Sequence, residues 1–222
     1  PDLANSVLKQ LVKPNNSYKP NGQDNFCQGY EYYRQIIKKK PQVTDSCSYD
    51  QWAQKVLTAF DTFQVLCALR QGPWGVEGLN QRIEKWLNDK QILPLWYEGR
   101  PVMISSNDYT LGLMNGDIGI TLRDHNNNLR VVFGTNEGET GESLRWISPL
   151  RLPHVETAYA MTVHKSQGSE FSHVVLVLPE VQSRVLTREL IYTGITRAKE
   201  NFTLVETGPK IFIQAIKTTC CF

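Results

Sequence analysis

The sequence predicts an α/β protein in which a parallel sheet, covered by helices, is interrupted by a small antiparallel β-barrel of the SH3-like type. Apolar runs at 63–69 and 173–178 are typical of strands buried on both faces. Segments with helical spacing of apolar residues precede and follow these runs. Between 96 and 152 the pattern changes to short strands separated by turns. We therefore expect an α/β domain at 26–95 and 153–222, with the barrel at 96–152 inserted into it.

Composition sets broad limits on the function. The 222 residues are 41% hydrophobic, enough for a sizeable core. A balance of 24 basic and 22 acidic side chains leaves a net charge of only +2. Any contact with nucleic acid must therefore be local. The five cysteines include no C-x-x-C pair, which argues against a disulfide framework and a zinc ribbon.

No targeting signal is evident in the sequence. The longest aliphatic run, at 174–178, is far shorter than the roughly 20 residues that cross a bilayer. The first residues do not resemble a signal peptide. We expect a soluble, cytoplasmic protein, and the absence of an initial methionine is what an excised fragment would show.

The elements of the α/β domain follow from apolar spacing and capping residues. We predict a flexible lead-in at 1–25 with a short helix at 3–12, helices at 28–39 and 49–60, the second capped by Ser48, and a strand at 63–69. A helix is predicted at 76–89. After the barrel come strands at 157–163 and 173–178, a helix at 187–199, a strand at 202–206 and a last helix after Pro209.

The barrel prediction depends on four strand patterns: Pro-Val-Met-Ile, Gly-Asp-Ile-Gly-Ile-Thr-Leu, Leu-Arg-Val-Val-Phe and Leu-Arg-Trp-Ile. Asn115-Gly116, three asparagines at 126–128 and a Gly/Glu-rich stretch separate them and are turn signals.

The segment 162–171, Thr-Val-His-Lys-Ser-Gln-Gly-Ser-Glu-Phe, gathers polar groups between two apolar strands. A glycine-containing loop that leaves a parallel strand and opens a helix offers N–H groups to an anion. Thr162, His164, Lys165 and Ser166 add donors, and Glu170 can accept from a sugar hydroxyl. An ordinary polar loop with a helix cap would explain only Ser166 and Gly168. The segment therefore predicts an anion site.

The segment 190–199, Leu-Ile-Tyr-Thr-Gly-Ile-Thr-Arg-Ala-Lys, is predicted to continue a helix capped by Thr187. Ile191, Ile195 and Ala198 are expected to face the sheet. Gly194 costs a helix about 1 kcal/mol relative to Ala, which indicates close packing there or the close approach of another chain. Arg197 lies off this apolar face, and taken alone it would be interpreted as a surface residue.

Taken in order, the two segments resemble motifs V and VI of superfamily 1 DNA helicases, in the version found in the RecD family. The similarity extends to 63–80, which resembles motif IV, and to 96–119, and so covers roughly residues 60–207. The resemblance implies a RecA-like, P-loop NTPase-type domain. In this family two such domains enclose ATP and Mg²⁺ and move along single-stranded DNA, and this chain would be the second of them.

The resemblance also assigns roles to residues. Arg197 would be the arginine finger, and Arg70, directly after the predicted strand at 63–69, would be a second candidate for contact with the γ-phosphate. The expected nucleotide contacts are Glu170, Gly168 and Gln167. Contacts with the DNA backbone or the interdomain hinge are expected from Thr162, His164, Lys165 and Ser166. A planar, permanently charged donor suits a transferring phosphoryl group.

The chain departs from the family pattern in one respect. It contains no Gly-Lys-Thr or Gly-Lys-Ser and no Asp-Glu pair, so the Walker lysine and the magnesium carboxylates are absent. Both belong to the first RecA-like domain. The chain can then complete an ATP site but cannot make one, and the fragment alone is expected to be inactive.

The resemblance implies a 5′–3′ helicase subunit of exodeoxyribonuclease V (RecBCD), which acts in double-strand break repair and recombination with RecB- and RecC-like partners. The alternative is a non-catalytic nucleic-acid-binding or subunit-docking module. A Walker motif upstream of Pro1 would favour the helicase. No metal-site pattern of paired carboxylates with a lysine points to a nuclease.

Overall fold

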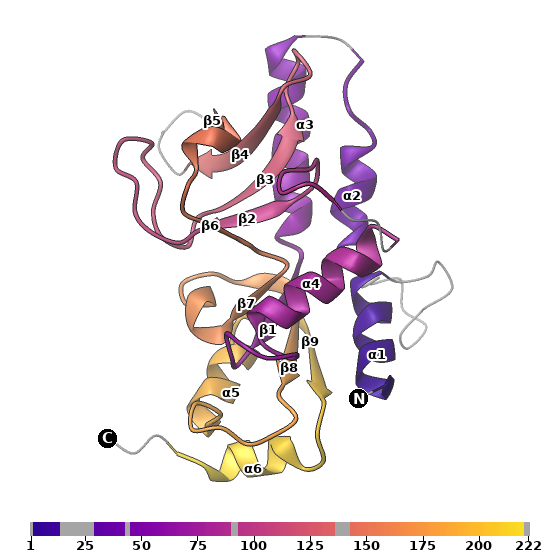
Figure 1. Cartoon of the computed structure of the whole chain (residues 1–222), viewed down its shortest axis with the longest axis vertical. Coiled ribbons are helices and arrows are strands. Elements are labelled where there is room, and N and C mark those ends of the chain that lie inside the picture. Colours follow the sequence, from indigo (N-terminus) through magenta and orange to yellow (C-terminus); the bar gives the residue numbers. More distant parts are fainter. Residues whose placement is uncertain (1, 14–28, 43–44, 90–92, 136–142, 220–222) are drawn as a thin grey trace. The chain divides into compact units, whose positions relative to one another are not determined.

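The computed structural model describes residues 2–13, 29–42, 45–89, 93–135 and 143–219 (Figure 1). Internal contacts divide the chain into two compact units. The parallel-sheet unit comprises 1–31, 61–90 and 159–222, and the antiparallel unit comprises 32–60 and 91–158. Residues 32–60 thus group with the inserted segment, and their assignment to the α/β domain was wrong.

The parallel-sheet unit contains four strands in the order β7 (Ala160–Thr162), β1 (Phe63–Cys67), β8 (Phe171–Leu178) and β9 (Ala198–Glu206). All neighbouring pairs are parallel. Every residue of β1 is buried, as expected of a strand covered on both faces. The predicted strands at 63–69 and 157–163 do lie in one sheet. The second is only three residues long here, because 155–157 pairs in the other sheet.

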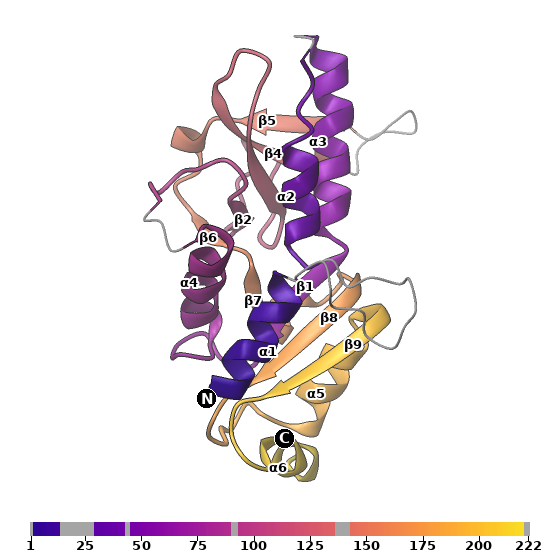
Figure 2. The same ribbon diagram turned by 90° about the vertical axis from the view of Figure 1, so that its right-hand side faces the viewer.

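Helices cover both faces of the parallel sheet (Figure 2). The chain crosses from β1 to β7 in one direction and from β7 through β8 to β9 in the other. Because parallel crossovers are right-handed, α4 (Val76–Leu87) lies on one face, and the 3₁₀-helix η3 (Val163–Ser166) and α5 (Arg188–Ile195) lie on the other. The contacts agree, since α4 packs on β7 and α5 packs on η3.

The short helix predicted at 3–12, within the lead-in at 1–25, is confirmed as α1 (Asp2–Val12) and is packed within the parallel-sheet unit. Leu8 and Val12 are fully buried, and the helix contacts α4 and β9. The Lys13 ammonium lies 2.7 Å from the Asp89 carboxylate. The flexible assignment is therefore wrong for 2–12, while 14–25 lies outside the described residues.

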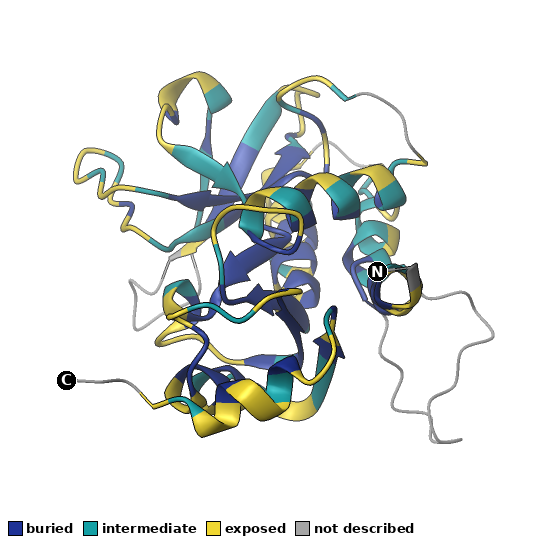
Figure 3. Cartoon of the chain, turned by 60° about the horizontal axis from the view of Figure 1, so that its bottom comes forward, coloured by how far each residue is buried: buried dark blue, intermediate teal, exposed yellow. Residues whose placement is uncertain are grey.

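Helix α5 ends four residues earlier than predicted. Thr187 caps it, because its hydroxyl accepts from the Leu190 N–H at 3.3 Å. Ala198 pairs with Phe171, so β9 begins where the helix was expected to continue. Ile195 is consequently 42% exposed and does not face the sheet. The last helix, α6 (Ile211–Lys217), contacts α5, and the outer faces of both are exposed (Figure 3).

The close packing predicted at Gly194 is confirmed. A Cβ atom at this position would lie 3.1 Å from Cδ2 of Leu176, a fully buried residue of β8. Glycine therefore allows α5 to approach the sheet closely.

The antiparallel unit is built on a five-stranded sheet in the order β5 (Ser143–Ile147), β4 (Leu129–Thr135), β3 (Ile118–Arg123), β2 (Pro101–Ile104) and β6 (Val155–Thr157). The four predicted strand patterns are confirmed as β2 to β5, and β6 is additional. Within the described residues the sheet has no pairing between β5 and β6. The structure thus shows an antiparallel sheet, and it does not show a closed SH3-like barrel. The Gly/Glu-rich stretch at 136–142 lies outside the described residues.

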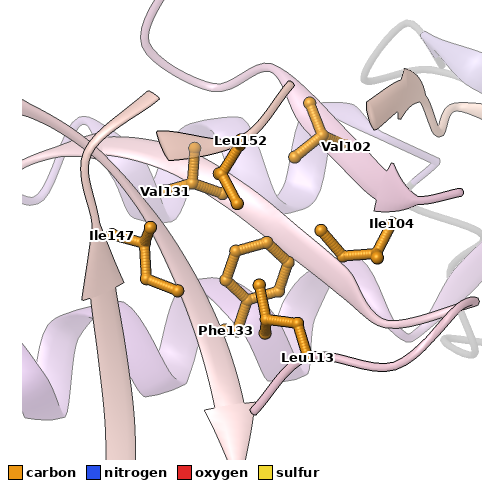
Figure 4. Packing of buried hydrophobic residues seen from close by; sticks show 7 residues of the cluster. All are labelled: Val102, Ile104, Leu113, Val131, Phe133, Ile147 and Leu152. Carbon is orange, nitrogen blue, oxygen red and sulfur yellow. The ribbon is translucent and has the colours of Figure 1, made fainter. Parts of the chain in front are cut away.

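The core of this unit lies around Phe133 of β4, which is 1% exposed (Figure 4). Six other buried side chains form the cluster with it: Val102, Ile104, Leu113, Val131, Ile147 and Leu152. Strands β2, β4 and β5 thus share one apolar centre with the segments that carry Leu113 and Leu152.

Two helices complete the antiparallel unit. Helix α3 (Ser46–Phe60) packs on β3 and β4, and the Trp52 indole N–H donates to the carbonyl of Ile36 in α2 (Glu31–Ile37) at 2.9 Å. The predicted cap at Ser48 was wrong. Asp45 takes this role, because its carboxylate accepts from the Ser48 N–H at 2.7 Å.

Candidate functional site

The segment 162–170 carries the chain from the carboxyl end of β7 to the amino end of β8. No α-helix follows it, contrary to the sequence prediction. The four-residue η3 forms instead, and two hydroxyls hold it together: Thr162 Oγ1 accepts from the Lys165 N–H at 3.3 Å, and Ser166 Oγ donates to the Val163 carbonyl at 2.8 Å. The hydroxyls that were predicted to contact a phosphate therefore stabilise the loop.

Exposure separates the four residues predicted to contact DNA. Ser166 is fully buried and Thr162 is 9% exposed. His164 is exposed and Lys165 is half-buried. Among these four, His164 and Lys165 are the side chains that a ligand can reach at the carboxyl end of β7, and Ser166 is better explained as a structural residue.

Arg197 lies at the opposite end of the sheet, in the turn between α5 and β9. Its Nη1 donates to the Ser169 carbonyl at 3.1 Å, and its own carbonyl accepts from the Phe171 N–H at 2.9 Å. Its Nε is buried and has no hydrogen-bond partner in the described part of the chain. A buried unsatisfied donor costs about 1–3 kcal/mol, and such donors call for an explanation such as a ligand.

The predicted nucleotide contacts lie in the loop that Arg197 holds. Gln167, Gly168 and Glu170 are all exposed. Gly168 has φ +90°, a conformation that favours glycine and allows the chain to reverse between η3 and β8. The fold therefore brings Glu170 and Arg197, separated by 27 positions in the sequence (197 − 170), to the same edge of the sheet.

Arg70 does not lie with Arg197. Arg70 is exposed and follows the carboxyl end of β1, whereas Arg197 precedes the amino end of β9. Strand β8, which lies between these two strands, contains eight residues. At about 3.3 Å per residue it separates the two edges by roughly 23 Å. Arg70 and Arg197 therefore lie at opposite edges of the sheet and are alternative candidates for the γ-phosphate.

Two titratable side chains are buried within the sheet, His173 and Cys67. Burial lowers the pKa of His173 to about 4, and its Nε2 lies 2.8 Å from Thr203 Oγ1. Burial raises the pKa of the Cys67 thiol to about 12, so this cysteine is not a reactive thiolate. Both groups are neutral at pH 7 and are part of the scaffold.

Sequence reasoning missed two polar contacts that position the carboxyl edge. Asn80 of α4 binds the backbone of Ala160 in β7 twice, donating at 3.0 Å and accepting at 2.9 Å. The indole of Trp74 donates to the Glu180 carboxylate at 2.8 Å. The signal for the first was available, because Asn80 is a polar residue beside Leu79 on the apolar face of a helix.

The described residues contain neither a metal-binding group of side chains nor a helix suited to a membrane. Within these residues, no three His, Cys, Asp or Glu side chains are grouped so that they could hold a metal ion. None of the helices in the part of the chain that the structure describes is both long enough and apolar enough to cross a membrane.

Residues 157–205, which contain the loop and Arg197, match the family model for the UvrD-like helicase C-terminal domain. This segment is thus similar to a helicase C-terminal domain.

Full-length relatives narrow this class. The RecBCD enzyme subunit RecD of Mycolicibacterium smegmatis is 39% identical over 173 residues, which cover 75% of this chain and 30% of that protein. RecD of Haemophilus influenzae is 39% identical over 202 residues, which cover 85% of this chain and 29% of that protein. The ATP-dependent RecD2 DNA helicase of Deinococcus radiodurans is 34% identical over 144 residues, which cover 63% of this chain and 19% of that protein. The chain therefore corresponds to a C-terminal part of a RecD helicase and spans less than a third of the length of these relatives.

Solved structures of Pif1 helicases are also similar. A Bacteroides Pif1 in complex with ADP-AlF3 and ssDNA aligns at 15% identity with a TM-score of 0.40, covering 83% of this chain and 48% of that one. Pif1 from Candida albicans aligns at 15% identity with a TM-score of 0.38, covering 83% of this chain and 56% of that one. These scores are too low to support an argument.

Proposed function

We propose that this chain is the second motor domain of an ATP-dependent 5′–3′ DNA helicase, and that it supplies one wall of an ATP site. The hydrogen bond from Arg197 to the Ser169 carbonyl is the observation that best supports this role. It joins the two segments with helicase motifs into one surface at the amino edge of β8 and β9.

On this surface Arg197 would be the arginine finger and Glu170 would bind the nucleotide sugar, with Gln167 and Gly168 beside them. The guanidinium fits a phosphate ligand, because its Nε is buried without a hydrogen-bond partner in the described residues. Phosphate oxygens are strong acceptors for such a donor. When bound, ATP would supply the phosphoryl group whose developing charge Arg197 stabilises.

Mg²⁺ and the phosphate-binding loop would come from another RecA-like domain. The chain lacks Gly-Lys-Thr and Gly-Lys-Ser sequences, so it has no Walker lysine of its own. In the complete enzyme the two domains would enclose ATP, and domain closure would bring Arg197 to the γ-phosphate.

DNA would pass at the other edge of the sheet. His164 and Lys165 are exposed or half-buried beyond the carboxyl end of β7, where they can contact a phosphodiester backbone. Thr162 would act there through the backbone that it caps. Separate edges for nucleotide and DNA let one loop, 162–170, connect the two ligands.

We further propose that the antiparallel unit is the counterpart of the SH3-like insertion of RecD, and that the complete protein works with RecB- and RecC-like subunits in double-strand break repair and recombination. Three relatives named RecBCD enzyme subunit RecD, each 39–41% identical, support this assignment.

The test has two arms. The purified chain should not hydrolyse ATP, with or without single-stranded DNA. A RecD helicase whose matching part is replaced by this chain should retain DNA-stimulated ATPase. Hydrolysis by the chain alone would contradict the proposal, and so would an inactive but folded chimaera.

A further inference from the structure

We propose that Arg70 binds a backbone phosphate of single-stranded DNA and not the γ-phosphate of ATP. This inference rests on the proposed function, because it adds a residue to the DNA edge of the same domain. It replaces the role that the sequence pattern assigned to Arg70.

The first argument is the register of the sheet. Cys67, the last residue of β1, pairs with Thr162, the last residue of β7. Arg70 follows Cys67 by three residues, as Lys165 follows Thr162 (70 − 67 = 165 − 162 = 3). Neighbouring strands lie about 4.8 Å apart. Arg70 and Lys165 therefore leave the sheet at the same edge from adjacent strands.

The second argument is the topology. The chain leaves β1 toward the face covered by α4, and it leaves β7 and β8 toward the face covered by η3 and α5. The connection that leaves β1 and the connection that leaves its neighbour β8 therefore run over opposite faces of the sheet. In open parallel sheets, ligands bind outside the carboxyl ends of strands at such a switch point. Arg70 is the first charged side chain after β1 at this position.

The third argument is that the backbone of Arg70 is held in place. Its carbonyl accepts from the Glu77 N–H at 3.1 Å, and the Leu69 carbonyl accepts from the Val76 N–H at 3.0 Å. Trp74, in the same loop, is 3% exposed. Arg70 is exposed and its backbone belongs to an anchored turn, which suits a residue that positions a ligand.

On its β7–β1 side this edge also carries donors that suit a polyanion, whereas Glu180 and Glu206 lie at the ends of β8 and β9. Arg70 and Lys165 are cationic, and His164 can donate from its imidazole. Glu180 follows β8 at the same edge, and its carboxylate accepts from the Trp74 indole at 2.8 Å. A nucleotide at the opposite edge, roughly 23 Å away along β8, could not reach Arg70. A DNA strand that contacts His164 and Lys165 could.

The experiment measures binding of the chain to a fluorescein-labelled single-stranded oligothymidylate by anisotropy over a range of salt concentrations. Arg70→Ala should weaken binding several-fold at low salt. It should also lower the slope of log K against log salt by about 0.7, the value for one phosphate contact on a single strand. Arg70→Lys should retain most of the affinity, because a point charge can replace one phosphate contact. ATP affinity, measured in parallel in a RecD helicase whose matching part is replaced by this chain, should not change with either variant.

Controls separate this inference from the proposed function. Lys199→Ala removes an exposed cation at the amino edge and should leave the salt slope unchanged. The double variant His164→Ala, Lys165→Ala should weaken binding. If the double variant weakens DNA binding and Arg70→Ala does not, the proposed role of Arg70 is wrong, while the proposal that DNA binds at this edge is retained. If Arg70→Ala lowers ATP affinity alone, the original γ-phosphate role is restored. If neither variant alters DNA binding, the DNA edge itself is wrong.

Discussion

The Nη1 atom of Arg197 donates a hydrogen bond to the backbone carbonyl of Ser169 at 3.1 Å. One partner belongs to the turn before β9 and the other to the loop before β8, so the bond ties two separate sequence motifs together. A neutral carbonyl is a weaker acceptor than a phosphate oxygen. In the proposed function, the contact would hold the guanidinium in place without ATP and yield it to a γ-phosphate when the domains close.

Ser166 should be needed for the loop and not for DNA. Ser166→Ala removes the hydroxyl that donates to the Val163 carbonyl, and the free energy of unfolding should fall by about 1 kcal/mol, as for a typical buried hydrogen bond. Urea denaturation measures this change. The salt slope of DNA binding should be the same as for the parent chain, and a slope lower by about 0.7 would mean that Ser166 contacts a phosphate after all.

Gly194 should tolerate no side chain while Leu176 is intact. An added methyl would lie 3.1 Å from Leu176 Cδ2, and overpacking typically costs about 1–3 kcal/mol. The higher helix propensity of alanine offsets about 1 kcal/mol of this cost. We expect Gly194→Ala to destabilise the chain by up to about 2 kcal/mol in thermal or urea unfolding.

The control for Gly194 is a double-mutant cycle with Leu176→Val, which shortens the crowding side chain. The two substitutions together should cost less than the sum of the single costs. Additive costs would show that Gly194→Ala acts on the backbone and not through Leu176.

Stability should fall in mild acid because of His173. Its folded pKa of about 4 is below the unfolded value of 6.5, so the unfolded chain binds more protons between these pH values. The contribution is fully present above pH 6.5 and is lost as pH falls toward 4, by up to about 3 kcal/mol. His173→Gln cannot titrate and still offers an amide to Thr203. Urea unfolding of this variant between pH 4 and 7 should show a weaker pH dependence, and an unchanged pH dependence would mean that His173 is not its source.

Much of the fold was predictable because its strands and helices carry strong local signals. The apolar run at 63–67 and the spacing of Leu79, Ile83 and Leu87 specified β1 and α4 correctly. The errors came from tertiary pairing, which overrides local propensity. Ile195 to Lys199 continues a helical pattern, but pairing of Ala198 with Phe171 ends the helix and begins β9.

The site was predictable in part for the same reason. The motifs indicated Arg197, Glu170 and the loop as candidates, and their roles stay predictions, because a motif does not specify the edge of the sheet to which a residue belongs. Arg70 was grouped with Arg197 because both are arginines in helicase motifs. Only the strand register shows that they lie at opposite edges. Likewise, the sequence alone suggests that the hydroxyl of Ser166 binds a ligand. The structure shows that this hydroxyl donates to the Val163 carbonyl.

The central claim is that Arg197 acts on the γ-phosphate in the transition state, and it can be tested in a complete RecD helicase that carries this domain. Arg197→Ala removes the hydrogen bond to Ser169, which should cost the fold only about 1 kcal/mol. A thermal melt checks that the variant is folded, and a nucleotide titration should show a much smaller loss of affinity than of turnover. Arg197→Lys should rescue turnover poorly, because a point charge lacks the planar fork.

The most direct measurement is steady-state ATPase of the Arg197→Ala variant at saturating DNA. The arginine-finger role predicts a fall in turnover of at least about 10³-fold in a folded protein that still binds nucleotide. Near-normal turnover would contradict it, and Arg197 would then be a structural residue that holds the 166–170 loop against β9.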